Sequence, residues 1–326
     1  MVGVADLLEQ RKAAFGNQIE FFAPGLKRWQ TSEWRPENSR RFLPVSVTGQ
    51  SCALNCDHCQ TKVLEGMISV RMGENLFDLA AKLKAGGTEG ILVSGGSSKS
   101  GGVPLKRHLK HVPRIKEELG MRVVAHSGVV SPDLAGNLAD AGVDAVMLDI
   151  IGADETIEQV YHLPLTASDF DASLARLDAA GLRIIPHVVI GLHYGKILGE
   201  HRALEMIASH QIDTLILVVL TPLIGTPMAG VAPPAFEDVA GLFAEARGSM
   251  PGSRINLGCA RPMGDLKQRL DEAAIDSGLN GIAYPADGAI EYARSRGLDP
   301  VLYEWCCSMS WAQSPGEPAL VEVEVS

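Results

Sequence analysis

The sequence contains no long apolar run, no recognisable export signal and few cysteines. No stretch of about 18 consecutive apolar residues occurs, so we expect no membrane-spanning helix. The first residues, MVGVADLLEQRKAAFG, have no apolar core of signal-peptide length before a cleavage site. Six cysteines in 326 residues, three of them tightly clustered, do not fit a secreted disulfide scaffold. We therefore expect a protein of the reducing cytoplasm that has no membrane partner.

Excess positive charge is also missing. The chain has 29 Lys and Arg against 39 Asp and Glu, giving a formal net charge of -10. Because nucleic acid phosphates are bound by clustered Lys and Arg, this balance argues against a nucleic acid partner. The densest basic stretch, residues 106–111 (KRHLKH), is interpreted first as the solvated face of a helix. The 46% hydrophobic content is ordinary for a globular protein with a sizeable core.

What the sequence does contain is a repeat of short apolar segments, each followed by a helical pattern. The apolar segments are β-branched and typical of buried parallel strands. They cover residues 44–49, 90–94, 122–126, 145–150, 183–190, 214–220, 254–259 and 281–283. Helical patterns cover residues 76–85, 108–119, 132–141, 172–180, 204–209, 236–246, 265–275 and 289–295. Eight strand–helix units predict an α/β fold, a closed (β/α)8 barrel of the TIM type.

The predicted barrel spans residues 44–298 and has a segment on either side. Residues 1–43 are an N-terminal extension, with a helix over 4–15 and aromatic residues around a Pro-Gly turn that we expect to pack on the barrel. Residues 299–326 are a C-terminal tail ending in a low-complexity acidic stretch, SPGEPALVEVEVS. Active sites of such barrels lie at the carboxyl ends of the strands, so functional residues are expected there.

Three cysteines follow the first predicted strand in one short loop. Cys52, Cys56 and Cys59 have C-x3-C-x2-C spacing. Thiolates are soft ligands that suit zinc or iron–sulfur clusters. A structural zinc site needs a fourth protein ligand, and no second pair at short spacing follows. Three thiolates on a four-iron cluster would leave one iron open to a small molecule. A zinc loop or a chance grouping of cysteines is the alternative.

The C-x3-C-x2-C loop after an apolar strand resembles the signature loop of the radical SAM superfamily. The resemblance implies a [4Fe-4S] cluster whose open iron chelates S-adenosylmethionine. It also implies that S-adenosylmethionine is cleaved reductively to a 5′-deoxyadenosyl radical, which removes an unreactive hydrogen. The cofactor would carry the chemistry, and the protein would position and shield it. An electron donor such as a flavodoxin or ferredoxin is implied as a partner.

The resemblance also assigns candidate cofactor-binding residues. His58 stands where the family more often has an aromatic residue near the adenine. Gly95 and Gly96 resemble the glycine-rich stretch that holds the methionyl amino group, since a backbone carbonyl is approached closely only where no Cβ intrudes. Ser97 replaces the usual acidic residue there. The loop 97–102, SSKSGG, is either an anion-binding loop or a solvent-exposed one, and it lacks the Walker spacing.

Further candidates lie at the ends of the third, fourth and fifth strands. His187 and Gly191, in HVVIGLHYG, resemble the motif that packs on the adenine; the alternative for His187 is a satisfied core histidine. His126, Ser127 and Asp149 are candidates for contacts with the ribose or the substrate. Hydrogen bonding within the barrel rim is an equal alternative for these three residues.

The remaining cysteines form a second set. Cys259 ends the seventh predicted strand, and Cys306 and Cys307 are adjacent in the tail. If the tail folds back over the barrel, these thiols can share an auxiliary iron–sulfur cluster, because adjacent cysteines suit a polynuclear site better than a single ion. Candidates for a fourth ligand are Ser308, Ser310 and Arg261. Alternatively, Cys259 is a small buried hydrophobe and the pair is incidental.

Sulfur-inserting members of the superfamily use an auxiliary cluster as the sulfur source. The chain resembles biotin synthase, which has a full barrel and an arginine ligand on its auxiliary cluster. FFAPGLKRW, GCARPMGDLKQRLDEAAIDSGLNGIAYP and the tail Cys-Cys-Ser resemble one component of the two-component lipoyl synthases. That resemblance implies sulfur insertion into an octanoyl chain on a protein lysine, for which an apolar barrel lumen would be suitable. It also implies a lipoyl carrier domain and a paralogous radical SAM protein as partners.

Two other kinds of function stay open at this point. One is another radical SAM reaction on a small molecule, namely biotin-synthase-like sulfur insertion, methylation or rearrangement. The other is a non-enzymatic iron–sulfur or zinc protein, which would form no 5′-deoxyadenosine. An iron count of about eight per chain would indicate a second cluster, and about four would argue against it.

Overall fold

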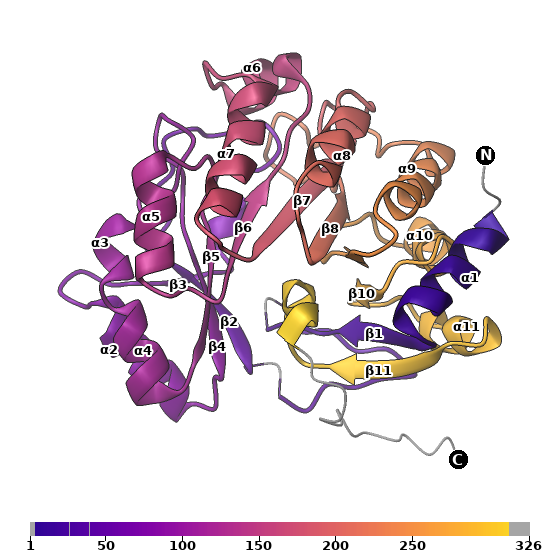
Figure 1. Cartoon of the computed structure of the whole chain (residues 1–326), viewed down its shortest axis with the longest axis horizontal. Coiled ribbons are helices and arrows are strands. Elements are labelled where there is room, and N and C mark those ends of the chain that lie inside the picture. Colours follow the sequence, from indigo (N-terminus) through magenta and orange to yellow (C-terminus); the bar gives the residue numbers. More distant parts are fainter. Residues whose placement is uncertain (1–3, 26, 39, 313–326) are drawn as a thin grey trace.

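The computed structural model describes residues 4–25, 27–38 and 40–312, so the acidic end of the tail lies outside the described residues. Its centre is a curled parallel sheet with helices on the outer face (Figure 1). The strands are β1 (Gln18–Phe22), β2 (Phe42–Ser46), β3 (Ile68–Ser69), β4 (Gly90–Ser94), β5 (Arg122–His126), β6 (Ala145–Asp149), β7 (Ile184–Ile190), β8 (Thr214–Val219), β9 (Arg254–Leu257), β10 (Gly281–Ala283) and β11 (Asp299–Tyr303).

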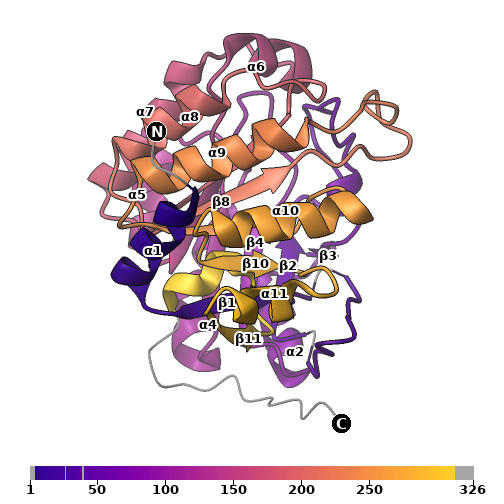
Figure 2. The same cartoon turned by 90° about the vertical axis from the view of Figure 1, so that its right-hand side faces the viewer.

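The helices lie mostly between successive strands, as the alternating pattern predicted. They are α1 (Val4–Phe15), α2 (Leu76–Ala85), α3 (Lys106–Leu109), α4 (Val112–Leu119), α5 (Pro132–Asp140), α6 (Asp154–Tyr161), α7 (Ala167–Ala179), α8 (Glu200–Ala208), α9 (Phe236–Ser249), α10 (Asp265–Asp276) and α11 (Ala289–Ser295), with 3-10 turns η1 (Lys62–Leu64) and η2 (Cys307–Ala312). Figure 2 shows α9 and α10 side by side across the outside of the sheet. Within the described residues, no helix combines the length and hydropathy that a bilayer crossing requires.

The eleven strands form one hydrogen-bonded sheet. Their order is β11-β1-β10-β9-β8-β7-β6-β5-β4-β2-β3, and each pairing between them is parallel. No pairing joins β11 to β3 among the residues that the structure covers, so the predicted closure of the barrel by hydrogen bonds is wrong. The α/β barrel class itself is confirmed.

All eight predicted strands are present, and three more were not predicted. β1 and β11 lie outside residues 44–298, and β1 hydrogen-bonds to both β10 and β11. The aromatic residues expected only to pack on the barrel, Phe21 and Phe22, are thus part of its sheet. The helix predicted over 108–119 is divided into α3 and α4 near Pro113, which lacks a backbone N–H.

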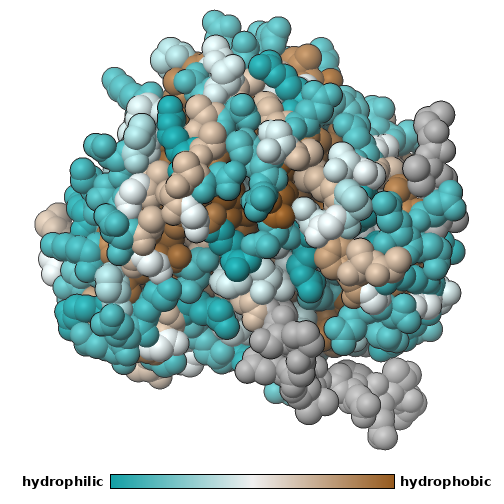
Figure 3. Space-filling model, in the orientation of Figure 1, coloured by the Kyte–Doolittle hydropathy of each residue, from teal (hydrophilic) through white to brown (hydrophobic). Residues whose placement is uncertain are grey.

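The sheet has two apolar faces. The outer one packs on the helices, and the inner one is a smaller cluster contributed by side chains from alternate strands. Inner residues include Phe22, Phe42, Met147, Ile185 and Ile216. On the face shown in Figure 3, hydrophilic residues cover the periphery and hydrophobic ones lie near the middle, over the strands.

The tail enters the space enclosed by the sheet. Figure 1 shows η2 among the strands, and Met309 is fully buried there. Asn256 Nδ2 donates to the Cys307 carbonyl at 2.9 Å and to Ser310 Oγ at 3.0 Å. The Trp311 ring lies 4.3 Å from the Arg183 guanidinium, beside the start of β7. η2 therefore fills the lumen towards the amino ends of the strands, and the expectation of a lumen free to take an octanoyl chain is wrong for that part.

Candidate functional site

A cavity of about 320 Å³ lies at the carboxyl ends of β2, β4, β5 and β6. The site residues predicted from the sequence that line it are Cys52, Cys56, His58, Cys59, Gly95, Gly96, His126 and Asp149. Most of its other lining is apolar, including Leu54, Leu163 and Phe170. Residues far apart in the chain thus meet at the strand ends, as predicted, and the cysteine thiols lie beside an apolar wall.

The cysteine loop packs directly on the end of β4, and glycine makes this packing possible. A Cβ on Gly96 would lie 2.1 Å from the carbonyl oxygen of Ser51 and 2.6 Å from the Cα of Cys52. The Ala53 N–H donates to the Ser97 carbonyl at 2.8 Å. Gly96 is therefore required for the loop to sit here, a packing role that differs from the predicted contact with a cofactor.

The loop holds its three thiols in different surroundings. Cys56 and Cys59 are buried, and their thiols are in hydrogen-bonding contact. The Cys56 thiol, assisted by His58, lowers the pKa of Cys59 to about 4. Cys52 is partly exposed, with Sγ 3.8 Å from the Ser97 carbonyl oxygen. In the described part of the chain, no three His, Cys, Asp or Glu side chains form a group that could hold one metal ion. Three neighbouring thiols suit a polynuclear cluster, whose ligands bind different metal atoms.

A carboxylate that sequence reasoning passed over anchors this loop. Asp57 accepts hydrogen bonds from Tyr194 Oη at 2.7 Å and lies 2.9 Å from His162 Nε2, while its N–H donates to the Val160 carbonyl. Although burial opposes the shift, the bonds from Tyr194 and His162 lower the pKa of Asp57. We call Asp57, His162 and Tyr194 the loop anchor.

An aromatic residue also faces the cavity from α6. Tyr161 lies 5.2 Å from the ring of His58, centroid to centroid, and both residues line the cavity. Burial raises the pKa of Tyr161 well above its ordinary value, so its hydroxyl stays protonated. Little in the sequence pointed to Tyr161 as a site residue, because α6 was not predicted.

The remaining strand-end candidates divide into two groups. His126 Nε2 lies 3.9 Å from Asp149 Oδ1, and the His126 ring meets the His187 ring edge-on at 5.9 Å. Burial lowers the pKa of His187 to about 4, so this imidazole is neutral at pH 7. His187, Ser127 and Gly191 are not among the residues lining the cavity.

Ser127 and Gly191 have contacts within the protein. Ser127 is fully buried, and its hydroxyl donates to the Gly128 carbonyl at 3.0 Å. Gly191 has φ +80°, and a Cβ there would lie 2.7 Å from the ring of Pro234. Packing within the protein accounts for both positions; for Ser127 this is the rim alternative stated above.

The second set of cysteines comes together beside β9. The Cys307 thiol is in hydrogen-bonding contact with both the Cys259 and Cys306 thiols. Ser308 Oγ donates to Cys306 Sγ at 3.1 Å, and the contact with Cys307 lowers the pKa of Cys306 to about 7. The return of the tail thus brings three thiols and one hydroxyl to one place inside the curled sheet, while Ser310 lies further in against Asn256.

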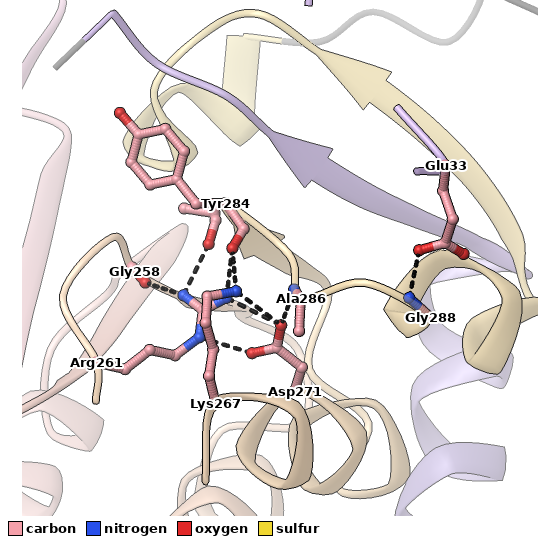
Figure 4. A network of polar contacts seen from close by, with 9 residues as sticks. Glu33, Gly258, Arg261, Lys267, Asp271, Tyr284, Ala286 and Gly288 are labelled. Carbon is pink, nitrogen blue, oxygen red and sulfur yellow. Dashed lines mark hydrogen bonds and ion pairs between the residues drawn. The ribbon is translucent and has the colours of Figure 1, made fainter. Parts of the chain in front are cut away.

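Arg261 is close to Cys259 in the sequence, but its guanidinium is hydrogen-bonded to other groups (Figure 4). Its guanidinium donates to both carboxylate oxygens of Asp271, at 2.6 and 3.0 Å, and to three backbone carbonyls. These five bonds use every N–H that the guanidinium has. Both side chains of the pair are at most 1% exposed. The structure therefore gives no support to Arg261 as a cluster ligand, and Ser308 is the better placed candidate.

Comparisons with known proteins agree with this geometry. A family model described as Radical SAM superfamily matches residues 46–210. A biotin synthase of Vibrio atlanticus is 25% identical over 256 residues, covering 74% of this chain and 69% of the relative. A biotin synthase of Brucella canis is 25% identical over 277 residues, covering 78% of each.

Solved structures share the fold. Methylornithine synthase aligns with a TM-score of 0.58 at 13% identity, covering 91% of this chain and 88% of that one. The FeFe-hydrogenase maturase from Carboxydothermus hydrogenoformans aligns with a TM-score of 0.61 at 16% identity, covering 91% and 71%. At such low identity these likenesses concern the arrangement of strands and helices only.

Proposed function

The chain belongs to the radical SAM superfamily, and we propose that its reaction is sulfur insertion into an octanoyl chain carried by a protein. The observation that carries this proposal is the second set of thiols, Cys259, Cys306 and Cys307, gathered inside the sheet and separate from the cysteine loop. A radical SAM enzyme that only abstracts hydrogen needs one cluster. A second thiol set gives a place for a cluster that donates sulfur.

We assign Cys52, Cys56 and Cys59 to the cluster that binds S-adenosylmethionine. The donor set fits, since the loop supplies three soft ligands and no fourth, beside a cavity that accommodates a small molecule. When bound, this pair of cofactors supplies the 5′-deoxyadenosyl radical. His58 and Tyr161 line the cavity with ring faces, which suits an adenine, and the apolar wall excludes water from the reacting carbon.

Other predicted residues keep narrower roles in this proposal. His126 and Asp149 line the cavity and offer polar atoms to the ribose or the substrate. Ser127, His187 and Gly191 would support the strand ends around the cavity without lining it. Cys259, Cys306 and Cys307 would hold the auxiliary cluster, with Ser308 as its fourth ligand.

Sulfur insertion into a small molecule, as in the relatives named biotin synthase, fits about equally well. The protein-bound octanoyl substrate is favoured by the likeness of FFAPGLKRW and the Cys-Cys-Ser tail to one component of the two-component lipoyl synthases. The proposed partners are a flavodoxin or ferredoxin, a lipoyl carrier domain and a paralogous radical SAM protein. A non-enzymatic iron–sulfur role would leave the cavity at the strand ends without a purpose.

Anaerobic incubation of the reconstituted enzyme with S-adenosylmethionine, reductant and an octanoyl-lysine peptide tests the proposal. It is run with and without a paralogous partner and followed by mass spectrometry. We expect 5′-deoxyadenosine and a peptide mass that increases by sulfur. Deoxyadenosine and sulfur transfer to dethiobiotin instead would favour the biotin-synthase-like alternative. No deoxyadenosine under any condition would refute the enzymatic assignment.

A further inference from the structure

Lys27 is a cation that the chain holds beside the second thiol set without a carboxylate partner. Its ammonium lies 4.4 Å from the centre of the Tyr284 ring. Among the residues that the structure describes, no carboxylate forms an ion pair or a hydrogen bond with Lys27. Burial lowers the pKa of Lys27, and the group that opposes this shift is the Cys259 thiol. The main anionic neighbour of this lysine is therefore a thiol of the second set.

Tyr284 fixes the position of the ammonium. It is 1% exposed and packs in the inner apolar cluster with Cys306 and Cys307. Its hydroxyl donates to the Pro24 carbonyl at 2.5 Å, three residues before Lys27. A cation over the face of an aromatic ring is attracted by the negative charge density of that face. One ring thus links Lys27 to the second thiol set.

The segment that follows Lys27 is tied to the barrel as well. The Trp29 ring lies 6.0 Å from the Tyr284 ring, centroid to centroid. Glu33 accepts a hydrogen bond from the Gly288 N–H at 2.7 Å (Figure 4). Because these contacts lie after Lys27 and the Pro24 bond lies before it, the backbone around this lysine is held on both sides.

Two buried cations beside the same thiols share one carboxylate (Figure 4). Arg261 and Lys267 both pair with Asp271, at 2.6 and 3.5 Å. Arg261 follows Cys259 closely in the chain and donates to the Gly258 carbonyl at 2.9 Å. Burial lowers the pKa of Lys267 to about 8, so this amine is mostly protonated at pH 7. Two cations and one carboxylate leave one positive charge uncompensated here.

The second thiol set therefore lies in positive surroundings. In the part of the chain that the structure covers, no carboxylate is among the main groups that shift the pKa of Cys259, Cys306 or Cys307. The Cys307 thiol lowers the pKa of Cys259, and the charge of Lys27 adds to this effect. The whole chain has a formal net charge of -10, so these surroundings differ from the average of the molecule. They suit an anionic occupant.

We propose that Lys27 is the positive counter-charge of an anionic iron–sulfur cluster held by Cys259, Cys306 and Cys307. This role rests on the proposed function, which assigns a cluster to the second thiol set. A cluster with thiolate ligands is an anion, and reduction adds one more negative charge. Because a nearby cation stabilises the reduced form more than the oxidised form, Lys27 raises the reduction potential of this cluster. Lys27 acts through its charge and not as a ligand.

A redox titration followed by electron paramagnetic resonance tests this role. The reconstituted Cys56→Ala enzyme is used, because its cysteine loop lacks a ligand and the second cluster alone gives the signal. In that background Lys27→Gln removes the charge. We expect the equilibrium constant for reduction to fall about tenfold, a shift of about 59 mV to lower potential for one electron. Lys27→Arg keeps the charge and should keep the potential.

Arg269→Gln is the matched control. It also removes a cation that lies over an aromatic ring, 4.1 Å from the centre of Phe236, but on the outer helix α10. Its potential should equal that of the Cys56→Ala enzyme. A second control is the triple variant Cys259→Ala/Cys306→Ala/Cys307→Ala, in which the loop cluster remains. There Lys27→Gln should leave the potential unchanged.

The possible results separate the role of Lys27 from the proposed function. An unchanged potential of the second cluster in Lys27→Gln would overturn the role of Lys27. Equal shifts in Lys27→Gln and Arg269→Gln, or equal shifts in the two clusters, would overturn it as well. If the expected shift is found but the unchanged enzyme transfers no sulfur, the proposed function alone fails. A reconstituted Cys56→Ala enzyme that holds no iron would refute both.

Discussion

Arg261 shows how the surroundings of one residue decide between two roles. Its five hydrogen bonds and its ion pair with Asp271 are buried. Replacing Arg261 with Ala leaves Asp271 buried without its main partner, and such losses cost about 3–5 kcal/mol. We expect the free energy of unfolding to fall by that amount in chemical denaturation. The double variant Arg261→Ala/Asp271→Leu should recover part of the loss. An Arg261→Ala protein of normal stability that retains less iron would restore the ligand hypothesis.

The loop anchor gives a second prediction at the scale of a residue. Tyr194→Phe removes the hydroxyl that donates to Asp57, so the cysteine loop loses one of its ties to the rest of the barrel. We expect a stability loss of about 1 kcal/mol and faster release of iron from the loop to a chelator. Tyr292→Phe is the matched control, because it removes a similar bond, to Asp276 at 2.8 Å, that does not involve the cysteine loop. Equal iron release by the two variants would contradict an anchoring role.

Sequence reasoning found the thiols but not what holds them. Cysteines at C-x3-C-x2-C spacing are visible within one loop, and the strand-end rule placed His126 and Asp149 beside them. The partners of Asp57 are 105 and 137 positions away, so no local pattern could join them. Gly96 was recognised as special, but the close approach of Ser51 and Cys52 could not be read from the sequence.

Among the elements, η2 is the one whose place was least expected. Met309 is fully buried in the lumen, between residues contributed by several strands. Met309→Ala should lower the free energy of unfolding by about 2–5 kcal/mol because it leaves a cavity. Met309→Leu conserves volume and should cost less than about 1.5 kcal/mol. Both are measured by denaturant unfolding. If Met309→Ala were neutral, η2 would not be part of the folded core.

The elements that were predicted correctly are those with a strong local signal. β4, β5 and β10 match their predicted bounds because short β-branched runs between glycines or polar residues are typical of buried strands. β1 and β11 were missed, since QIEFF and DPVLY form strands through long-range pairing, of β1 with β10 and β11, that no local pattern reports. The sheet is likewise left open between β11 and β3 because these strands do not pair, and the periodicity of the sequence does not show which strands pair.

At the scale of the whole molecule, the two thiol sets come from opposite ends of the chain. Cys52, Cys56 and Cys59 follow β2, whereas Cys306 and Cys307 follow β11 and meet Cys259, just past the end of β9, inside the curled sheet. The second set exists only when the tail is inside the sheet. Assembly of an auxiliary cluster is therefore coupled to docking of η2, while the first loop depends on β2, β4 and the loop anchor.

This separation predicts that one cluster can be removed without the other. The triple variant Cys259→Ala/Cys306→Ala/Cys307→Ala should retain about four iron atoms per chain where the unchanged enzyme holds about eight. It should still form 5′-deoxyadenosine, because its cysteine loop is untouched, but transfer no sulfur. Cys56→Ala should show the reverse, with the second cluster kept and deoxyadenosine lost. Iron analysis and product chromatography measure both. About four iron atoms in the unchanged enzyme would mean that the second thiols are core side chains, and sulfur insertion would lose its source.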